Sequence, residues 1–254
     1  MPLDRRKQIL ELLDETGSVS LNNLSKLFPD VSIMTLRRDL TQFENEGMVI
    51  RTHGGAVKAN KVKTYGGDET AYEARENEHL EAKRIIAKKA LPYIETGRSI
   101  YLDSGSTIMS LVDLIPDDSY SIITSGVNIA QNLLEKEKPS VIVLGGFANR
   151  NTLSMSGPLS SDQLDRLNID VAFISASGFS TDHHFTVSNI YEAELKTKIL
   201  KKAKKVIVLV DSSKFGKSLP YTFATLSDID LLITETELPV EIQTAFQTAA
   251  IAIL

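Results

Sequence analysis

The stretch Val31–Leu40, VSIMTLRRDL, decides how the first part of this chain folds. Ser32 suits the position before a helix, because its hydroxyl can accept a hydrogen bond from an otherwise free backbone N–H. Apolar residues then recur at helical spacing and predict one buried stripe, made of Ile33, Leu36, Leu40 and Phe43. At about 100° per residue, Arg38 falls almost opposite this stripe and Arg37 falls on its flank. The exposed side also carries Met34, Thr35, Thr41 and Gln42.

An outer face with a small hydroxyl, an amide and an arginine suits the base edges in a DNA major groove. Taken alone, the segment is more typical of an ordinary solvated helix, but the flanking sequence favours DNA. Ser20 can begin an earlier helix, whose apolar face is Leu21, Leu24 and Leu27. Phe28-Pro29-Asp30 ends that helix, because proline cannot continue it. Two helices separated by a short turn predict a helix-turn-helix whose second helix reads DNA.

Two short strands after this helix predict a wing. Residues 48–52, MVIRT, form an apolar strand, and residues 53–57, HGGAV, supply a glycine turn into a second strand. Such a wing can place Arg51 or His53 against a phosphate or in a minor groove.

The whole segment Arg5–Val57 resembles the N-terminal domain of DeoR-family bacterial transcriptional regulators, through the runs MTLRRDL and HGGAV. The resemblance implies a winged helix-turn-helix that binds operator DNA. It places the reading helix on Ser32, Met34, Thr35, Arg37 and Arg38, and the wing on Arg51, His53, Gly54 and Gly55. Ser20 and Gln42 complete the set of residues that we expect at the DNA.

Composition is that of a soluble globular protein with one large or two modest domains: 254 residues, 42% hydrophobic and 24% charged. No apolar run approaches the roughly 18 residues that span a membrane, and the N-terminus has no apolar signal region. The chain contains no cysteine, which excludes disulfides and thiolate metal sites. We expect a cytoplasmic protein that does not bind a membrane and has neither a metal nor a cofactor.

The net charge of the chain is negative, which is unusual for a protein that is expected to bind DNA. The net charge is −5, and residues 1–58 hold as many acidic as basic residues. The basic ones are Arg5, Arg6, Lys7, Lys26, Arg37, Arg38, Arg51 and Lys58. A neutral domain attracts phosphates only modestly, so we expect paired DNA-binding domains in a homo-oligomer, either a dimer or a tetramer.

The second half has a different pattern. Residues 58–68 are polar and aperiodic, which predicts a DNA-binding domain at 1–57, a linker at 58–78 and an α/β domain at 79–254. Strands are expected at 99–103, 120–124, 141–144, 171–176, 206–211 and 231–234. Helices are expected near 80–91, 107–114, 127–137, 159–167, 190–203 and 239–249, with 69–77 partly helical. Apolar strands that alternate with helices predict a mainly parallel sheet covered on both faces, with 221–224 and 250–254 as candidate edge strands.

Small and polar residues follow these strands, at the edge where parallel sheets bind ligands. Asp103-Ser104-Gly105-Ser106-Thr107 leads into a helix and predicts a phosphate loop, since a helix N-terminus offers N–H groups and about half a positive charge. The other strand ends carry Thr124, Ser125, Gly126, Gly145, Gly146, Ser177, Gly178, Asp211, Ser212, Ser213 and Lys214. Any one glycine is explained by a tight turn, but the set predicts a pocket for a small phosphorylated ligand.

Residues 81–236 also resemble the DeoR family, in its sensor domain, through IYLDSGST, VIVLGG, VAFISASG, EAELKTKIL and VIVLVDSSKFGK. The resemblance implies a fold similar to ribose-5-phosphate isomerase and a phosphorylated sugar as effector. It makes Lys196 and Lys214 candidate ligand contacts, with Asp211 nearby. Two loops depart from the family, Thr124-Ser125-Gly126 and Thr186-Val187-Ser188-Asn189. Both are expected at the sugar end of the ligand, so they leave its identity open.

Three other signals are weaker. Six lysines between residues 196 and 205 can form a basic patch, but, Lys196 apart, they are more typical of a solvated helix face. His183-His184 lacks the further ligands that a metal site needs. Phe215–Ser218 resembles the end of a phosphate-binding P-loop, but Asp211 stands where the motif requires glycine.

The sequence therefore predicts a DNA-binding regulator, a repressor of a sugar operon, controlled by a phosphorylated sugar. The alternative is a sugar-phosphate isomerase with an accessory DNA-binding module, in which Asp103 or Asp211 acts as the base. A sugar-phosphate sensor with no DNA role is a third interpretation.

Overall fold

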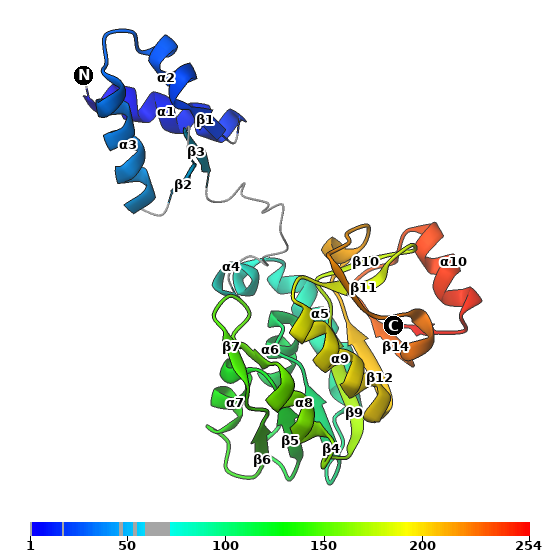
Figure 1. Ribbon diagram of the computed structural model, residues 1–254. Coiled ribbons are helices and arrows are strands. Elements are labelled where there is room, and N and C mark those ends of the chain that lie inside the picture. The colour runs from blue at the N-terminus through cyan, green and yellow to red at the C-terminus, as the bar shows by residue number, and fades with distance from the viewer. Residues whose placement is uncertain (1, 17, 46–47, 53–54, 59–71) are drawn as a thin grey trace. The chain divides into compact units, whose positions relative to one another are not determined.

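The computed structural model describes residues 2–16, 18–45, 48–52, 55–58 and 72–254. The chain divides into two compact units, Met1–Gly66 and Gly67–Leu254. Most elements of each unit are labelled in Figure 1.

The first unit is a winged helix-turn-helix, as predicted. It contains α1 (Pro2–Thr16), β1 (Ser18–Ser20), α2 (Leu21–Leu27), α3 (Ile33–Asn45), β2 (Val49–Thr52) and β3 (Gly55–Lys58). The three strands form an antiparallel sheet in the order β1-β3-β2. Its core is apolar and includes Ile9, Leu13, Leu24, Leu36, Leu40 and Phe43.

Two residues of the predicted apolar stripes are not buried. Ile33 is 49% exposed and Leu27 is 53% exposed. Ile33 begins α3 and Leu27 ends α2, so both side chains lie at helix ends, beyond the contact with the neighbouring helix. Strand β1 was not predicted, because three residues are too few to show a period.

The wing needs glycine at its base. Gly55 pairs with Ser20 where β3 meets β1. A Cβ at Gly55 would lie 2.8 Å from the Ser20 Cα, closer than real side chains approach. The glycine of this motif is thus explained by the third strand.

The second unit is built on a parallel sheet of seven strands in the order β15-β14-β12-β9-β4-β5-β6. These strands are β4 (Ser99–Leu102), β5 (Ser121–Thr124), β6 (Ser140–Val143), β9 (Ile169–Ser175), β12 (Ala203–Leu209), β14 (Leu231–Ile233) and β15 (Ala252–Ile253). The chain runs outward from β4 to β6, then returns to β9 on the other side of β4. The order of the strands therefore reverses between β4 and β9.

Helices cover both faces of this sheet, as predicted for apolar parallel strands. One face packs against α5 (Leu80–Ala90), α6 (Ser106–Val112) and α7 (Val127–Leu133). The other packs against α8 (Pro158–Leu164), α9 (Ile190–Lys202) and α10 (Val240–Thr248). A short helix, α4 (Tyr72–Asn77), precedes α5, and short 3-10 helices are η2 (Leu91–Tyr93), η3 (Ser212–Lys214) and η4 (Leu226–Asp228). No described helix combines the length and apolar character needed to cross a membrane.

Smaller strands extend this core. A hairpin of β7 (Phe147–Asn149) and β8 (Ser154–Ser156) follows β6. A separate antiparallel sheet contains β10 (Gly178–Ser180), β11 (His184–Val187) and β13 (Tyr221–Ala224). Residues 221–224 are therefore not an edge strand of the main sheet: Phe223 and Ala224 are buried in the core that includes α9. The other candidate, β15, does lie at the edge.

Candidate functional site

The reading helix α3 is fixed at its start by hydroxyl groups. The Ser32 Oγ accepts a hydrogen bond from the Thr35 N–H at 3.2 Å and lies 2.9 Å from the Thr35 Oγ1. The Ser20 Oγ accepts one from the Asn23 N–H at 3.1 Å and caps α2 in the same way. Both serines, expected at the DNA, thus also cap the helices that form the motif.

The outer face of α3 has the predicted composition. Met34 is 75% exposed, and Arg37 and Arg38 are both exposed. Thr35 and Gln42 are half-buried beside them. The structure therefore brings five of the predicted DNA-binding residues onto one helix.

Asp39 positions this helix, a role that its sequence context did not predict. Its carboxylate is buried and accepts hydrogen bonds from the Arg5 Nε at 2.7 Å and the Arg6 Nε at 2.8 Å. These ion pairs join α1 to the middle of α3. A signal existed, because Asp39 stands three residues after Leu36 and four before Phe43, on the buried stripe.

The wing is described in part. Arg51 lies in β2, although its side chain is outside the described part of the structure. His53 and Gly54, both expected at the DNA, are outside the described residues. Their role at the DNA remains a prediction.

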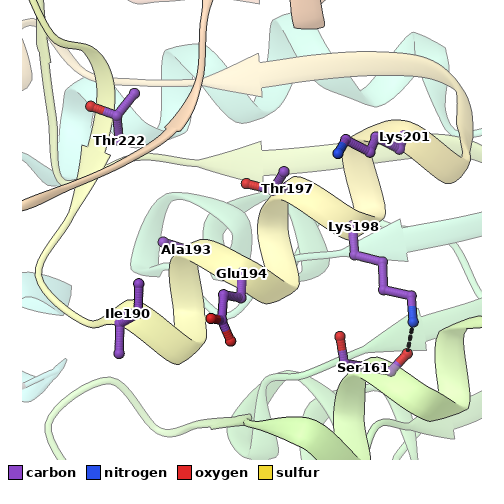
Figure 2. A pocket seen from close by; sticks show the side chains of 8 residues that line it. All are labelled: Ser161, Ile190, Ala193, Glu194, Thr197, Lys198, Lys201 and Thr222. Carbon is purple, nitrogen blue, oxygen red and sulfur yellow. Dashed lines mark hydrogen bonds between the residues drawn. The ribbon is translucent and has the colours of Figure 1, made fainter.

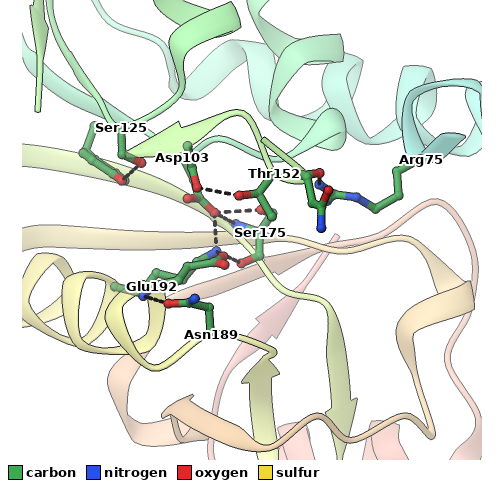
Figure 3. A network of polar contacts seen from close by, with 11 residues as sticks. Arg75, Asp103, Ser125, Thr152, Ser175, Asn189 and Glu192 are labelled. Atoms are coloured by element: carbon green, nitrogen blue, oxygen red, sulfur yellow. Dashed lines mark hydrogen bonds and ion pairs between the residues drawn. The ribbon is translucent and has the colours of Figure 1, made fainter. Parts of the chain in front are cut away.

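In the second unit, predicted residues meet where the strand order reverses, which is the position at which open parallel sheets bind ligands. Asp103 follows β4 and Ser175 ends β9. The Asp103 Oδ2 accepts hydrogen bonds from the Ser175 N–H at 2.9 Å, the Ser175 Oγ at 2.7 Å and the Lys196 Nζ at 2.6 Å. Lys196, on α9, also pairs with Glu192 at 3.1 Å. Figure 3 shows this network.

These contacts decide the protonation of Asp103. Burial alone would raise its pKa, but the Lys196 ammonium and the two Ser175 donors outweigh burial and lower the pKa below its ordinary value. A carboxylate with a lowered pKa is a weak proton acceptor at neutral pH. The geometry therefore does not favour Asp103 as the base of an isomerase, and it suits a rigid support for the loop that follows.

The loop after Asp103 is packed tightly. Ser104, Ser106 and Thr107 are buried. A Cβ at Gly105 would lie 2.8 Å from the Ser175 Cβ, so only glycine lets β4 and β9 approach this closely. The predicted phosphate loop is thus packed against the hydrogen-bonded group of Asp103, Ser175 and Lys196.

The remaining predicted residues lie at other strand ends. The Ser125 Oγ hydrogen-bonds with the Tyr101 hydroxyl at 2.9 Å, and the Thr124 Oγ1 accepts from the Gly126 N–H at 3.0 Å. Asp211 caps η3 by accepting from the Ser213 N–H at 3.1 Å. Lys214 is half-buried, and among the described residues its ammonium has neither a hydrogen bond nor an ion pair.

Three predicted glycines serve the packing of the backbone. The Gly145 N–H donates to the Gln163 Oε1 at 3.0 Å. Gly146 has a φ of 149°, which favours glycine. Gly178 lies in β10, where a Cβ would meet the Lys217 carbonyl oxygen at 2.6 Å. Each position thus has a structural explanation, and an effector contact there remains a prediction.

Two cationic residues at this site were missed. The Arg75 guanidinium on α4 donates to the Asn151 carbonyl at 3.2 Å. Lys83 is only 3% exposed, and its ammonium donates to the Arg75 carbonyl. Burial lowers the pKa of Lys83, with Asp211 opposing the shift and Lys214 adding to it, so these groups share one electrostatic environment. Lys83 could have been found, because it stands at helical spacing from the buried Ile86 and Ala87.

Three of the other lysines in the basic run contact their own unit. Lys198 pairs with Asp165 at 2.8 Å and Lys204 with Asp170 at 2.7 Å. The Lys202 ammonium donates at 2.5 Å to the Leu164 carbonyl. These contacts support an intramolecular role for the lysines.

A separate groove of about 440 Å³ lies along α9 (Figure 2). It is lined by Ser161, Ile190, Ala193, Glu194, Thr197, Lys198, Lys201 and Thr222. None of the predicted effector residues lines it, and Lys198 there donates to the Ser161 carbonyl at 2.6 Å. The groove is therefore distinct from the strand-end site.

Both units match known protein families. The DeoR-like helix-turn-helix domain matches residues 5–62, and the DeoR C terminal sensor domain matches residues 78–236.

Whole-length relatives give the same result. The chain is 33% identical to the HTH-type transcriptional regulator GolR of Listeria innocua, covering 99% of this chain and 98% of the relative. It is 34% identical to the L-fucose operon activator of Haemophilus influenzae, covering 94% of each, and 30% identical to a putative aga operon transcriptional repressor of Escherichia coli, covering 99% and 93%. A solved D-ribose-5-phosphate isomerase in complex with phospho-erythronic acid has 25% identity and a TM-score of 0.39, with 54% of each chain covered.

Proposed function

Since this chain belongs to the DeoR family of transcriptional regulators, we propose that it represses an operon of sugar metabolism and that a phosphorylated sugar controls it. The proposal assigns residues 1–57 to operator binding, 58–78 to a linker, and 79–254 to effector binding and oligomerisation. It places the protein in the cytoplasm.

On the DNA side, the exposed face of α3 supports the proposal. Arg38 projects away from the buried stripe and reads a base edge in the major groove, where arginine pairs best with guanine. Arg37 lies on the flank and contacts a phosphate. Arg51, His53 and Gly54 in the wing contact the adjacent backbone or minor groove.

On the effector side, one observation carries the proposal: the buried group of Asp103, Ser175 and Lys196 where the strand order reverses. It fixes the small residues 103–107 at the sheet edge that binds ligands in such folds. Lys83 and Lys214 add positive charge near this edge, which suits a phosphate group. A relative named for an L-fucose operon supports a sugar as the rest of the ligand.

The sign of regulation is part of the proposal. The relatives include both an activator and a putative repressor. We infer repression, relieved when the effector binds one arrangement of the oligomer better than the other.

A thermal-shift screen followed by gel shift tests this function. The full chain is heated with pentose and hexose phosphates, with the unphosphorylated sugars and with inorganic phosphate. A ligand at about 100 times its Kd stabilises the protein by about 2.7 kcal/mol, and the same ligand should release operator DNA. Lys214→Gln should weaken the shift, whereas Lys217→Gln, an exposed control nearby, should not. Stabilisation by free sugars alone would contradict a phosphate site.

A further inference from the structure

Helix α4 stands between the two family matches. It begins at Tyr72, after the match that ends at residue 62, and it ends at Asn77, before the match that starts at residue 78. Neither family description therefore covers it. Along the chain, α4 is also the first described element after β3 of the DNA-binding unit.

The backbone of α4 is joined to the proposed phosphate loop. The Arg75 carbonyl accepts a hydrogen bond from the Ser106 Oγ at 3.4 Å. The same carbonyl accepts from the Lys83 ammonium, which also reaches the Glu76 carbonyl at 3.5 Å. A movement of the Ser106 or Lys83 side chain would therefore alter hydrogen bonds to the backbone of α4.

The side chain of Arg75 reaches the same sheet edge. Its donation to the Asn151 carbonyl places the guanidinium at the turn of the β7–β8 hairpin. That hairpin lies on the end of β5, because the Met155 N–H donates to the Ser125 carbonyl at 2.8 Å. In Figure 3, Arg75 extends from α4 toward Thr152, in the network that contains Asp103 and Ser175.

The buried ammonium of Lys83 makes the position of α4 sensitive to charge. A buried cation needs acceptors, and carbonyl groups of α4 supply them. A bound phosphate would offer charged acceptors to the cations at this edge. Charged acceptors hold a guanidinium more strongly than a neutral carbonyl does, and a phosphate can accept two of its N–H groups at once.

We propose that α4 is part of the effector site: Arg75 binds the phosphate group of the effector, and binding thereby fixes the helix that leads along the chain to the DNA-binding unit. This inference rests on the proposed function. Arg75 is then a group that the effector contacts differently in two arrangements, which a ligand needs in order to shift an equilibrium.

The test uses the full chain and inorganic phosphate as the probe, with potassium chloride at equal ionic strength as the reference. Phosphate affinity is measured by calorimetric titration, and hydrogen exchange is followed in the backbone amides of Tyr72–Asn77. The variants are Arg75→Gln and Arg75→Lys. The control is Arg84→Gln, which removes an exposed arginine from the neighbouring α5.

We expect phosphate to slow exchange in α4 of the natural protein and of Arg84→Gln. Arg75→Gln should weaken phosphate binding by about tenfold and abolish the slowing, because it loses a charged hydrogen bond. Arg75→Lys should retain part of the phosphate affinity and part of the slowing of exchange. If Arg75→Gln does not fold, Arg75→Lys is compared directly with the natural protein.

Two results would overturn the inference while the proposed function stands. In one, Arg75→Gln binds phosphate as tightly as the natural protein. In the other, phosphate binds the natural protein without slowing exchange in α4. If neither inorganic phosphate nor any sugar phosphate binds the natural protein, the proposed function fails and the inference fails with it.

Discussion

Replacing Lys196 by methionine should destabilise the second unit, because it leaves Asp103 buried without its cation. The two side chains are 3% and 2% exposed, and the Nζ–Oδ2 distance is 2.6 Å. Removing one partner of a buried ion pair costs about 3–5 kcal/mol. Both Ser175 donors remain with Asp103, so we expect a loss near the lower limit, about 3 kcal/mol.

The loss should depend on pH in a defined direction. In the natural protein the pKa of Asp103 is lowered, so the ion pair contributes stability above the unfolded pKa of about 4, and that stability is lost as pH falls through the lowered folded value. Without Lys196, burial dominates and raises the pKa of Asp103. The variant then gains stability relative to the natural protein as pH falls from about 7 toward about 4.5, because Asp103 takes up a proton.

Urea unfolding of the full chain, followed by circular dichroism at several pH values, measures both effects. The double variant Asp103→Asn/Lys196→Met should recover part of the loss at neutral pH, because position 103 no longer carries a buried charge; the buried Glu192 still lacks its Lys196 partner. Lys201→Met, an exposed site on the same helix, should change stability by no more than about 0.5 kcal/mol. A Lys196→Met variant as stable as the natural protein at pH 7, or one whose deficit is constant with pH, would refute the reasoning.

Further changes test the DNA-reading helix and the loop. Arg38→Ala should cost about 1–3 kcal/mol on operator DNA in a gel shift and little on random DNA; equal weakening would count against base reading. Arg37→Ala should weaken both DNAs alike and reduce the salt dependence of binding by about one ion, which titration at several salt concentrations measures. Asp39→Asn should destabilise the first unit by about 2 kcal/mol, since the partly exposed Arg5 and Arg6 lose a charged acceptor, and protease resistance of residues 1–58 reports this. Gly105→Ala should weaken phosphate binding and lower the melting temperature, because the new Cβ would press on Ser175; an unchanged melting curve would contradict the packing.

Local patterns predicted most of the fold. The parallel strands β4, β5, β6, β9, β12 and β14 lie within about three residues of their expected positions, because buried parallel strands are apolar runs bounded by polar residues. The hairpin β7–β8 and strands β10 and β11 were not expected, because three or four residues show no period. Their pairing is set by neighbouring elements and not by their own sequence.

The site was predictable only where its residues belong to recognisable runs. Lys196 stands in EAELK and Asp103 in LDSGST, so the sequence alone indicates both as candidate effector-binding residues. Asp39 was not selected, because its arginine partners lie 34 and 33 residues away. Arg75 was not predicted as a site residue for the same reason, since its hydrogen-bond acceptor is 76 residues further along the chain.

The buried Asp39 also limits how many basic residues of the first unit can contact DNA phosphates. Residues 1–58 hold equal numbers of acidic and basic residues, and two of the basic ones, Arg5 and Arg6, are tied to Asp39 within the unit. Arg37 and Arg38 then provide all of the positive charge of α3, so we expect one copy to neutralise few phosphates and to bind DNA with modest affinity. We therefore expect strong operator binding to need linked copies, in which the second contact is effectively intramolecular. Under the proposed function, an effector that changes only the spacing of such copies would release the operator without altering α3.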